Sequence, residues 1–284
     1  MTHIMPFTMA INLFSLKTQL KDVRLIHVLG GDTLKDSLDI LVTNYSNEDY
    51  IEHHGIKGMH WGIRRYQDKN GRLTKEGINH YGNKNIRKAK TANLDKWGKS
   101  PETNTLYIAG YSGSGKSTTA LSLKKKGDTV LHLDGYSEPG SPNSITDKNF
   151  NKYLDKHCPQ WKLMKESSKS TKIKRHSKEY WDIVEKFDKA IDNYSKEEYK
   201  KGNRVIVEGV QIADGWLKGK PEDYNNKPVI VLGTNPVKSM SRAFSRDDRG
   251  NLIKGLGSLD SAREYIQWYR DTNKKLKNLS NAIK

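Results

Sequence analysis

Residues 108–123 read IAGYSGSGKSTTALSL, and the spacing of their glycines limits how this part of the chain can fold. An apolar run, TLYIA, comes immediately before the first glycine, and residues of helix-forming composition follow from Lys116. Glycines at positions 110, 113 and 115 allow positive φ angles, so that backbone amides can point inward around an anion. The N-terminus of the following helix adds a partial positive charge. The sequence therefore predicts a strand, an anion-binding loop and a helix that begins at Lys116.

From Gly110 to Ser117 the loop has the pattern G-x-x-x-x-G-K-S, which resembles the Walker A sequence of the P-loop NTPase superfamily. The resemblance implies that the chain binds a nucleoside triphosphate, ATP or GTP, together with Mg²⁺. Lys116 would then reach the β- and γ-phosphates, and Ser117 would place its hydroxyl on the metal. The residues expected to hold the nucleotide are Gly110, Ser112, Gly113, Ser114, Gly115, Lys116, Ser117 and Thr118. The alternative is a glycine-rich loop that matches the pattern by chance.

Apolar runs alternate with helical patterns after residue 104, which is typical of a parallel sheet covered on both faces. The expected strands lie in TLYIAG (105–110), DTVLHLDG (128–135), RVIVEG (204–209) and PVIVLG (228–233). Helical patterns are found near residues 146–157, 177–195, 236–247 and 259–280. The predicted fold class is α/β: a three-layer α/β/α P-loop domain over residues 100–284, with a mainly parallel sheet.

Asp134 ends the second apolar run, in VLHLDGY. The sequence D-x-[FY] at this place resembles uridine-kinase-like enzymes and, more loosely, the zeta-toxin sugar-nucleotide kinases. The resemblance implies that Asp134 faces an acceptor hydroxyl, which it would orient or deprotonate. A strand-end aspartate that caps a turn is the alternative.

Glu208 ends the third run, RVIVEG, and is a second acidic candidate. An acid at the end of a strand next to the P-loop strand occupies the position of a Walker B acid, where it would hold Mg²⁺ through a bound water. As a glutamate it could instead polarise an attacking water, as in ATPases. Ser117 and Glu208 are therefore the expected metal site, unless Glu208 is simply a strand-end acid.

A basic stripe follows the fourth run, in the helix expected from residue 236. Its members share one face of that helix and are Lys238, Arg242, Arg246 and Arg249. In P-loop kinases an arginine-bearing lid neutralises charge on the phosphates during transfer. Arg242 and Arg246 are the expected lid residues. The alternative is a solvated basic face, which Asp247 and Asp248 would suit.

Positive charge is concentrated in one N-terminal block. The whole chain has a formal net charge of +17, and residues 57–99 alone carry twelve basic and three acidic side chains. A surplus of this kind attracts polyanions such as nucleic acid. No run of about 18 apolar residues occurs, so we expect no membrane partner.

The segment HHGIKGMHWGIRRYQDKNGRLTKEGINHYG, residues 53–82, resembles a short sequence that recurs in tailed-phage structural proteins. The resemblance implies a phage-encoded protein located in the host cytoplasm, with the virion as a second location. Through residues 57–99 it would contact a capsid or head protein, or nucleic acid by stacking and charge. Its frequent glycines argue against a long helix, and residues 83–100 are expected to be a linker. The three histidines at 53, 54 and 60 raise a weaker metal-binding alternative.

These features predict three parts and one reaction. Residues 1–50 are expected to form a small helical or mixed segment, residues 51–99 the basic phage-type segment with its linker, and residues 100–284 a kinase-like domain. The expected reaction is Mg²⁺-dependent transfer of a γ-phosphoryl group to a small-molecule, nucleotide or nucleic-acid acceptor. Lys116, Asp134, Glu208, Arg242 and Arg246 are the expected catalytic residues. The alternatives are an ATP or GTP hydrolase, and a structural or nucleic-acid-binding protein that only binds nucleotide.

Overall fold

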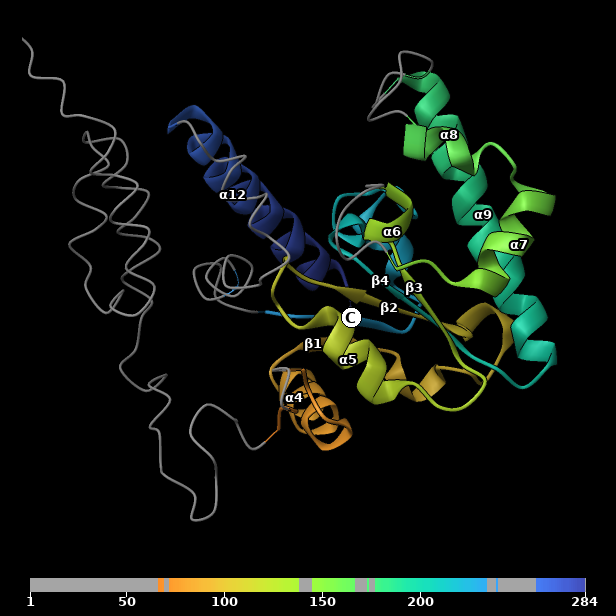
Figure 1. Ribbon diagram of the computed structural model, residues 1–284, viewed down its shortest axis with the longest axis horizontal. Helices are drawn as coiled ribbons and strands as arrows, with labels where there is room; N and C mark the ends of the chain where they lie inside the picture. The colour runs from red at the N-terminus through yellow and green to blue at the C-terminus, as the bar shows by residue number, and fades with distance from the viewer. Residues whose placement is uncertain are drawn as a thin grey trace, which may run out of the picture. The chain divides into compact units, whose positions relative to one another are not determined.

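A computed structural model of the 284-residue chain describes residues 66–68, 72–137, 145–166, 173, 177–233, 239 and 259–283. All of these belong to one compact unit, Lys57–Lys284. The segment expected over residues 1–50, the three clustered histidines and the arginine stripe at 238–249 lie outside the described residues. The described part is an α/β unit in which helices pack around a central sheet (Figure 1).

A five-stranded sheet forms the centre of the unit, in the order β1-β5-β2-β4-β3. The strands are β1 (Lys90–Ala92), β2 (Thr105–Ala109), β3 (Thr129–His132), β4 (Val205–Glu208) and β5 (Val229–Val231). β2 to β5 run parallel to one another, and β1 pairs antiparallel with β5 at one edge. The four strands expected from the apolar runs are therefore confirmed, and their mainly parallel arrangement is too. The sequence did not predict β1.

Helices cover both faces of this sheet. The described α-helices are α4 (Lys75–Arg87), α5 (Lys116–Leu123), α6 (Asp134–Ser137), α7 (Lys148–His157), α8 (Trp161–Glu166), α9 (Lys178–Lys200) and α12 (Leu259–Ala282). The helices expected near 146–157, 177–195 and 259–280 correspond to α7, α9 and α12. The helix expected over residues 236–247 falls almost entirely outside the described residues.

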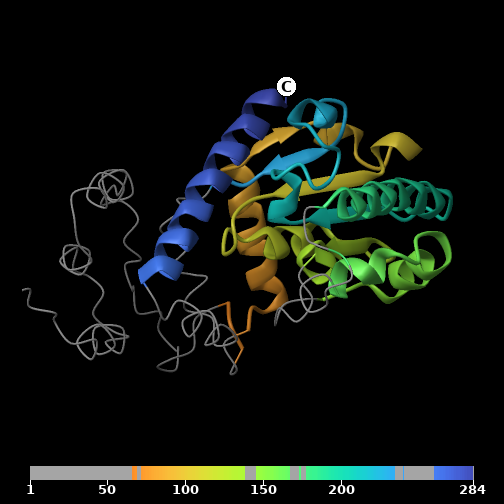
Figure 2. The ribbon, with the colours of Figure 1, turned by 90° about the horizontal axis from the view of Figure 1, so that it is seen from above.

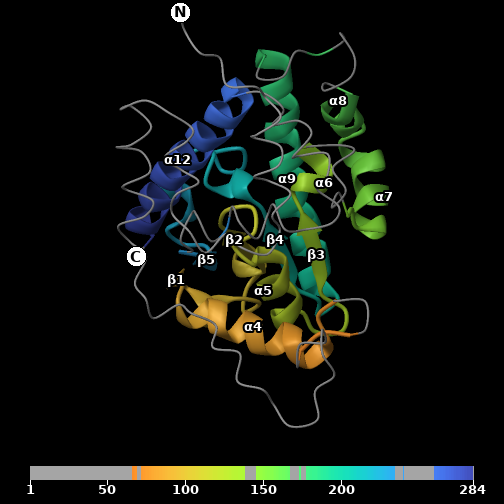
Figure 3. The same cartoon turned by 60° about the vertical axis from the view of Figure 1, so that its left-hand side comes forward.

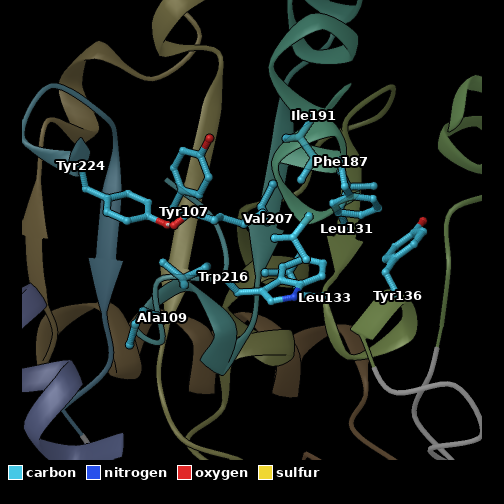
Figure 4. Packing of buried hydrophobic residues seen from close by; sticks show 14 of the residues in the cluster. Tyr107, Ala109, Leu131, Leu133, Tyr136, Phe187, Ile191, Val207, Trp216 and Tyr224 are labelled. Atoms are coloured by element: carbon cyan, nitrogen blue, oxygen red, sulfur yellow. The ribbon is translucent and has the colours of Figure 1, made fainter. Parts of the chain in front are cut away.

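Alternation along the strands divides the core into two layers. Leu106, Ile108, Ile206 and Ile230 point to the face covered by α4 and α5. The residues between them point to the opposite face, where they meet α9 and α12; these residues are Tyr107, Ala109, Leu131, Val205, Val207, Val229 and Val231. Figure 2 shows α12 lying along the sheet, and Figure 4 shows Phe187 and Ile191 of α9 against Leu131 and Val207. The three central strands, β2, β4 and β5, are thus buried on both sides, as is typical of parallel strands, whereas Lys90 of the edge strand β1 is exposed.

Helix α4 and strand β1 occupy the region predicted to be a linker, so that prediction is wrong. Two of the glycines that argued against a long helix, Gly77 and Gly82, lie inside α4. A Cβ on Gly82 would come within 2.0 Å of the Ser122 hydroxyl on α5, and a Cβ on Gly77 within 2.4 Å of the Tyr66 carbonyl oxygen. The absence of a side chain at these two positions lets Tyr66 and helix α5 approach α4 closely. The packing gained offsets the roughly 1 kcal/mol that each glycine costs a helix.

Candidate functional site

The loop Gly110–Ser117 connects β2 to α5, as the sequence predicts. Gly113 and Gly115 have φ angles of +83° and +94°, in the left-handed region that favours glycine. Gly110 is required for space, because a Cβ there would lie 2.6 Å from the Ser114 hydroxyl oxygen. The buried Ser114 hydroxyl has no hydrogen-bond partner among the described residues. The loop is thus tightly turned and retains an unsatisfied polar atom.

Lys116 and Ser117 open helix α5 and point to different partners. Lys116 is only 7% exposed, and its ammonium group donates a hydrogen bond of 2.8 Å to the Tyr111 carbonyl across the loop. The Ser117 hydroxyl donates to a carboxylate oxygen of Glu208, also at 2.8 Å. Thr118 follows in the first turn of the helix. Ser112 contributes its carbonyl, which accepts a hydrogen bond of 3.1 Å from the Tyr269 hydroxyl on α12.

Glu208 reaches Ser117 because of the strand order. β4 pairs in parallel with β2, so that Glu208 lies beside Ile108 at the carboxyl end of the sheet. On its other side Glu208 pairs with His132 of β3. The His132 ring nitrogen Nδ1 lies 2.5 Å from the same carboxylate oxygen that accepts from Ser117. The expectation that Glu208 ends a strand adjacent to β2 is therefore confirmed.

The carboxyl group of Glu208 is buried, with 4% of the residue exposed. Burial alone would raise its pKa. The hydrogen bond from His132, the charge of Lys116 and the hydrogen bond from Ser117 together lower the pKa below the ordinary value of 4.5. Glu208 is therefore held as a carboxylate inside the protein, next to a cation and a hydroxyl.

Asp134 begins α6, two residues beyond the end of β3. Its carboxylate accepts a hydrogen bond of 2.8 Å from the side-chain amide of Gln211, which follows β4. Asp134 and Glu208 thus lie at the carboxyl ends of two neighbouring strands, the edge at which open α/β sheets bind ligands. Asp134 is partly exposed.

Two further residues support the loop from outside it. Asn85 of α4 donates to the Thr119 hydroxyl at 3.2 Å and to the Gly115 carbonyl at 3.5 Å. Tyr269 of α12 stacks on Tyr111, with ring centroids 5.4 Å apart, while its hydroxyl holds Ser112. Figure 3 shows α4 and α12 on either side of the segment that carries the loop. Asn85 and Tyr269 are far from the loop in sequence, and no motif pointed to either.

The donor chemistry of this region fits an anion and a hard cation. Backbone amides of a glycine loop and a helix N-terminus suit phosphate. A serine hydroxyl beside a carboxylate offers the oxygen ligands that Mg²⁺ prefers. Among the described residues, no group of three or more His, Cys, Asp or Glu side chains is arranged to hold a metal by itself. Phosphate oxygens and water would therefore have to complete the coordination of any metal here.

Comparisons with known proteins cover a short part of the chain. The model of a family of unknown function, DUF7211, matches residues 43–68. No curated protein and no solved structure matches the chain. None of the helices in the described residues is long and apolar enough to cross a membrane.

Proposed function

We propose that this chain is a P-loop phosphotransferase, which binds ATP or GTP with Mg²⁺ and transfers the γ-phosphoryl group to an acceptor. The hydrogen bond between Ser117 and Glu208 carries the proposal. It joins the first turn after the loop to the end of the adjacent strand. In P-loop proteins these two positions hold the hydroxyl and the acid that organise the metal. A chance match would explain the glycines, but it would not explain an acid from another strand at this hydroxyl.

The roles of the residues follow from their surroundings. Ser117 and Glu208 would hold Mg²⁺, whose positive charge would offset the charge of the phosphates. Ser117 would supply one hydroxyl ligand, and the Glu208 carboxylate would orient a water ligand. The buried Lys116 would exchange its hydrogen bond to the Tyr111 carbonyl for one to a phosphate oxygen. The side chains named for the nucleotide therefore act by positioning and by charge, which dominate phosphoryl transfer.

Asp134 would act on the acceptor. It is ionisable, partly exposed and held in orientation by Gln211 at the ligand-binding edge of the sheet. A carboxylate there can accept the hydroxyl proton of an acceptor as the phosphoryl group transfers. Arg242 and Arg246, which lie outside the described residues, remain the residues proposed to close over the phosphates.

Hydrolysis of the nucleotide is the second candidate function. The observation that favours it is the contact between the buried Glu208 and the half-buried His132, because a glutamate at this position can polarise a water instead of holding the metal. The resemblance of residues 53–82 to phage structural proteins supports the further proposal that the protein is phage-encoded. It would then reside in the host cytoplasm or the virion.

Incubation with radiolabelled ATP or GTP, Mg²⁺ and a panel of hydroxyl and phosphate acceptors tests these proposals. We expect labelled acceptor from the wild-type protein, and at least a 100-fold loss of product from Lys116→Ala. Lys196→Ala, which removes an exposed lysine on α9, is the matched control and should retain activity. Asp134→Asn should lower transfer while nucleotide binding persists. Release of free phosphate alone would favour the hydrolase, and failure to bind any nucleotide would refute both enzyme proposals.

A further inference from the structure

Three aromatic rings gather at the N-terminal half of α4. Tyr66 and His80 are stacked, with centroids 4.5 Å apart and planes inclined by 18°. Tyr81 meets both rings edge-on, at 5.8 Å from Tyr66 and 5.2 Å from His80. Tyr81 is 37% exposed, and His80 is exposed as well. We refer to Tyr66, His80 and Tyr81 as the aromatic platform.

The backbone of α4 is adapted to hold this platform. Tyr66 lies against Gly77, where a Cβ would come within 2.8 Å of the Tyr66 Cβ atom. The Tyr66 carbonyl also accepts a hydrogen bond of 2.9 Å from the amide of Thr74, the N-cap residue of the helix. A helical glycine that admits a tyrosine indicates that the position of Tyr66 is specified by the fold.

Most of the exposed charged side chains on and near α4 are positive, with Glu76 in the first turn as an exception. Exposed cations lie before α4, on α4, directly after it and directly after α5; they are Arg72, Lys75, Lys84, Arg87, Lys88, Lys90, Lys124, Lys125 and Lys126. Within the described residues, none of these nine side chains forms an ion pair or a hydrogen bond. This group, which we call the α4 basic face, therefore has unneutralised charge available to a partner.

The two helices bring these charges together because they are antiparallel. Gly82 of α4 faces Ser122, whereas Asn85, further along α4, reaches Gly115 at the start of α5. Lys124–Lys126, which directly follow α5, therefore lie toward the N-terminal end of α4 rather than its C-terminal end. Figures 1 and 3 both show α4 lying alongside α5.

We propose that the aromatic platform and the α4 basic face bind single-stranded nucleic acid. Exposed aromatic rings stack on unpaired bases, and flanking lysines and arginines follow the phosphate backbone without reading sequence. A protein partner fits less well, because lysine is depleted at protein interfaces and charged residues are depleted from their cores. The site is separate from the nucleotide loop, so the proposal does not depend on the proposed phosphotransferase activity.

The proposal is tested by measuring the affinity of the full chain for a labelled strand of 20 thymidine nucleotides. The measurement uses fluorescence anisotropy, in the absence of nucleoside triphosphate. Binding should weaken steeply between 50 and 200 mM salt. Tyr81→Ala should weaken it about 5- to 100-fold, as expected for one lost base stack. Trp181→Ala is the matched control, because Trp181 of α9 is 39% exposed and should have no effect. Equal losses from the two variants, or no binding at 50 mM salt, would overturn the proposal.

Charge reversal separates a local contact from the general attraction of a basic protein. Lys84→Glu should weaken binding and reduce the salt dependence, whereas Lys196→Glu makes the same charge change on exposed α9 and should do so far less. Indistinguishable effects would mean that no specific face is used. Tighter binding of a duplex, or complete competition by anionic vesicles, would also contradict a base-stacking platform.

Two further variants address folding and independence. Gly77→Ala should keep the helix but displace Tyr66, so it should weaken oligonucleotide binding with little loss of helical circular dichroism. Lys116→Ala should bind the oligonucleotide as the wild type does, even where it no longer binds ATP. Loss of oligonucleotide binding in Lys116→Ala would move the site to the loop and refute the proposal. Absence of ATP binding alone would refute the proposed phosphotransferase and leave this inference standing.

Discussion

At the scale of single residues, the candidate site depends on one buried carboxylate. Glu208 has 4% exposure, and an isolated charge in such a place would be very costly. His132 and Ser117 both meet the same oxygen of its carboxylate, and Lys116 adds a positive charge nearby. These groups outweigh the effect of burial and keep the pKa of Glu208 below its ordinary value. The Glu208 side chain is therefore negatively charged at the place where a cation is expected to bind.

This lowered pKa has a consequence for stability. A carboxylate whose pKa is lower in the folded state stabilises the fold above its unfolded pKa of 4.5, and this stabilisation is lost as pH falls through the folded value. We therefore expect the unfolding free energy of Glu208→Gln to fall less between pH 7 and pH 3 than that of the wild type. Urea titrations at several pH values, in the absence of nucleotide, measure the unfolding free energy of both proteins. Glu222→Gln, at an exposed carboxylate, controls for the loss of charge; parallel curves for wild type and Glu208→Gln would contradict the expectation.

Sequence reasoning identified the loop residues and the two strand-end acids, since each occupies a fixed place relative to an apolar run. It missed His132, although alternation along VLHLD could have placed that side chain on the face of α5. Its partnership with Glu208 depends on the register between β3 and β4, which pairs these two residues directly. His132 and Glu208 are 76 residues apart in the chain, and the register of their strands is set by the tertiary fold. The sequence alone therefore did not predict their contact.

At the scale of elements, helix α4 shows how packing overrides composition. Two glycines within thirteen residues predict a weak helix. In the fold, Gly82 allows α4 to lie against Ser122 of α5, and Thr74 caps the helix by accepting from the Gly77 amide at 3.1 Å. The same glycines that lowered the helix propensity therefore make the contact with α5 possible. The contact also brings Asn85 to the loop Gly110–Ser117.

Asn85 is expected to support nucleotide binding without touching the nucleotide. Asn85→Ala removes the hydrogen bonds to Thr119 and to the Gly115 carbonyl, each of which contributes about 1 kcal/mol. We expect the affinity for Mg²⁺-ATP to fall about 5- to 10-fold in isothermal titration, with only a small change in melting temperature. The exposed Asn83 lies two residues away on α4, and Asn83→Ala should leave the affinity unchanged. An equal effect of both substitutions would show that Asn85 does not position the loop.

At the scale of the whole molecule, the residues before 100 complete the core. Ile86, Ala89, Leu94 and Trp97 pack on the face of the sheet that carries Leu106 and Ile206, and β1 covers the edge of β5. Trp97 also lies under the Arg204 guanidinium group, 3.8 Å from its ring centroid. Arg204 in turn pairs with the buried Asp128 at 2.6 Å. The composition of residues 83–99, which is polar and rich in lysine, suggested a domain boundary at residue 99. The few apolar residues of this stretch nevertheless pack against the sheet or its edge.

Two fragments should therefore behave differently. A fragment of residues 100–284 would lose β1, α4 and the apolar side chains that cover one face of the sheet. Each such side chain contributes on the order of 1–2 kcal/mol when partly buried, so the loss approaches the whole stability of a typical domain. We expect this fragment to aggregate or to unfold without a cooperative transition. A fragment of residues 57–284, the compact unit, should unfold cooperatively, and its affinity for Mg²⁺-ATP should equal that of the full chain. Circular dichroism melts and size-exclusion chromatography of the two fragments make the comparison. A cooperatively folded 100–284 fragment with unchanged melting temperature would contradict it, and would mean that α4 and β1 contribute nothing to the core they cover.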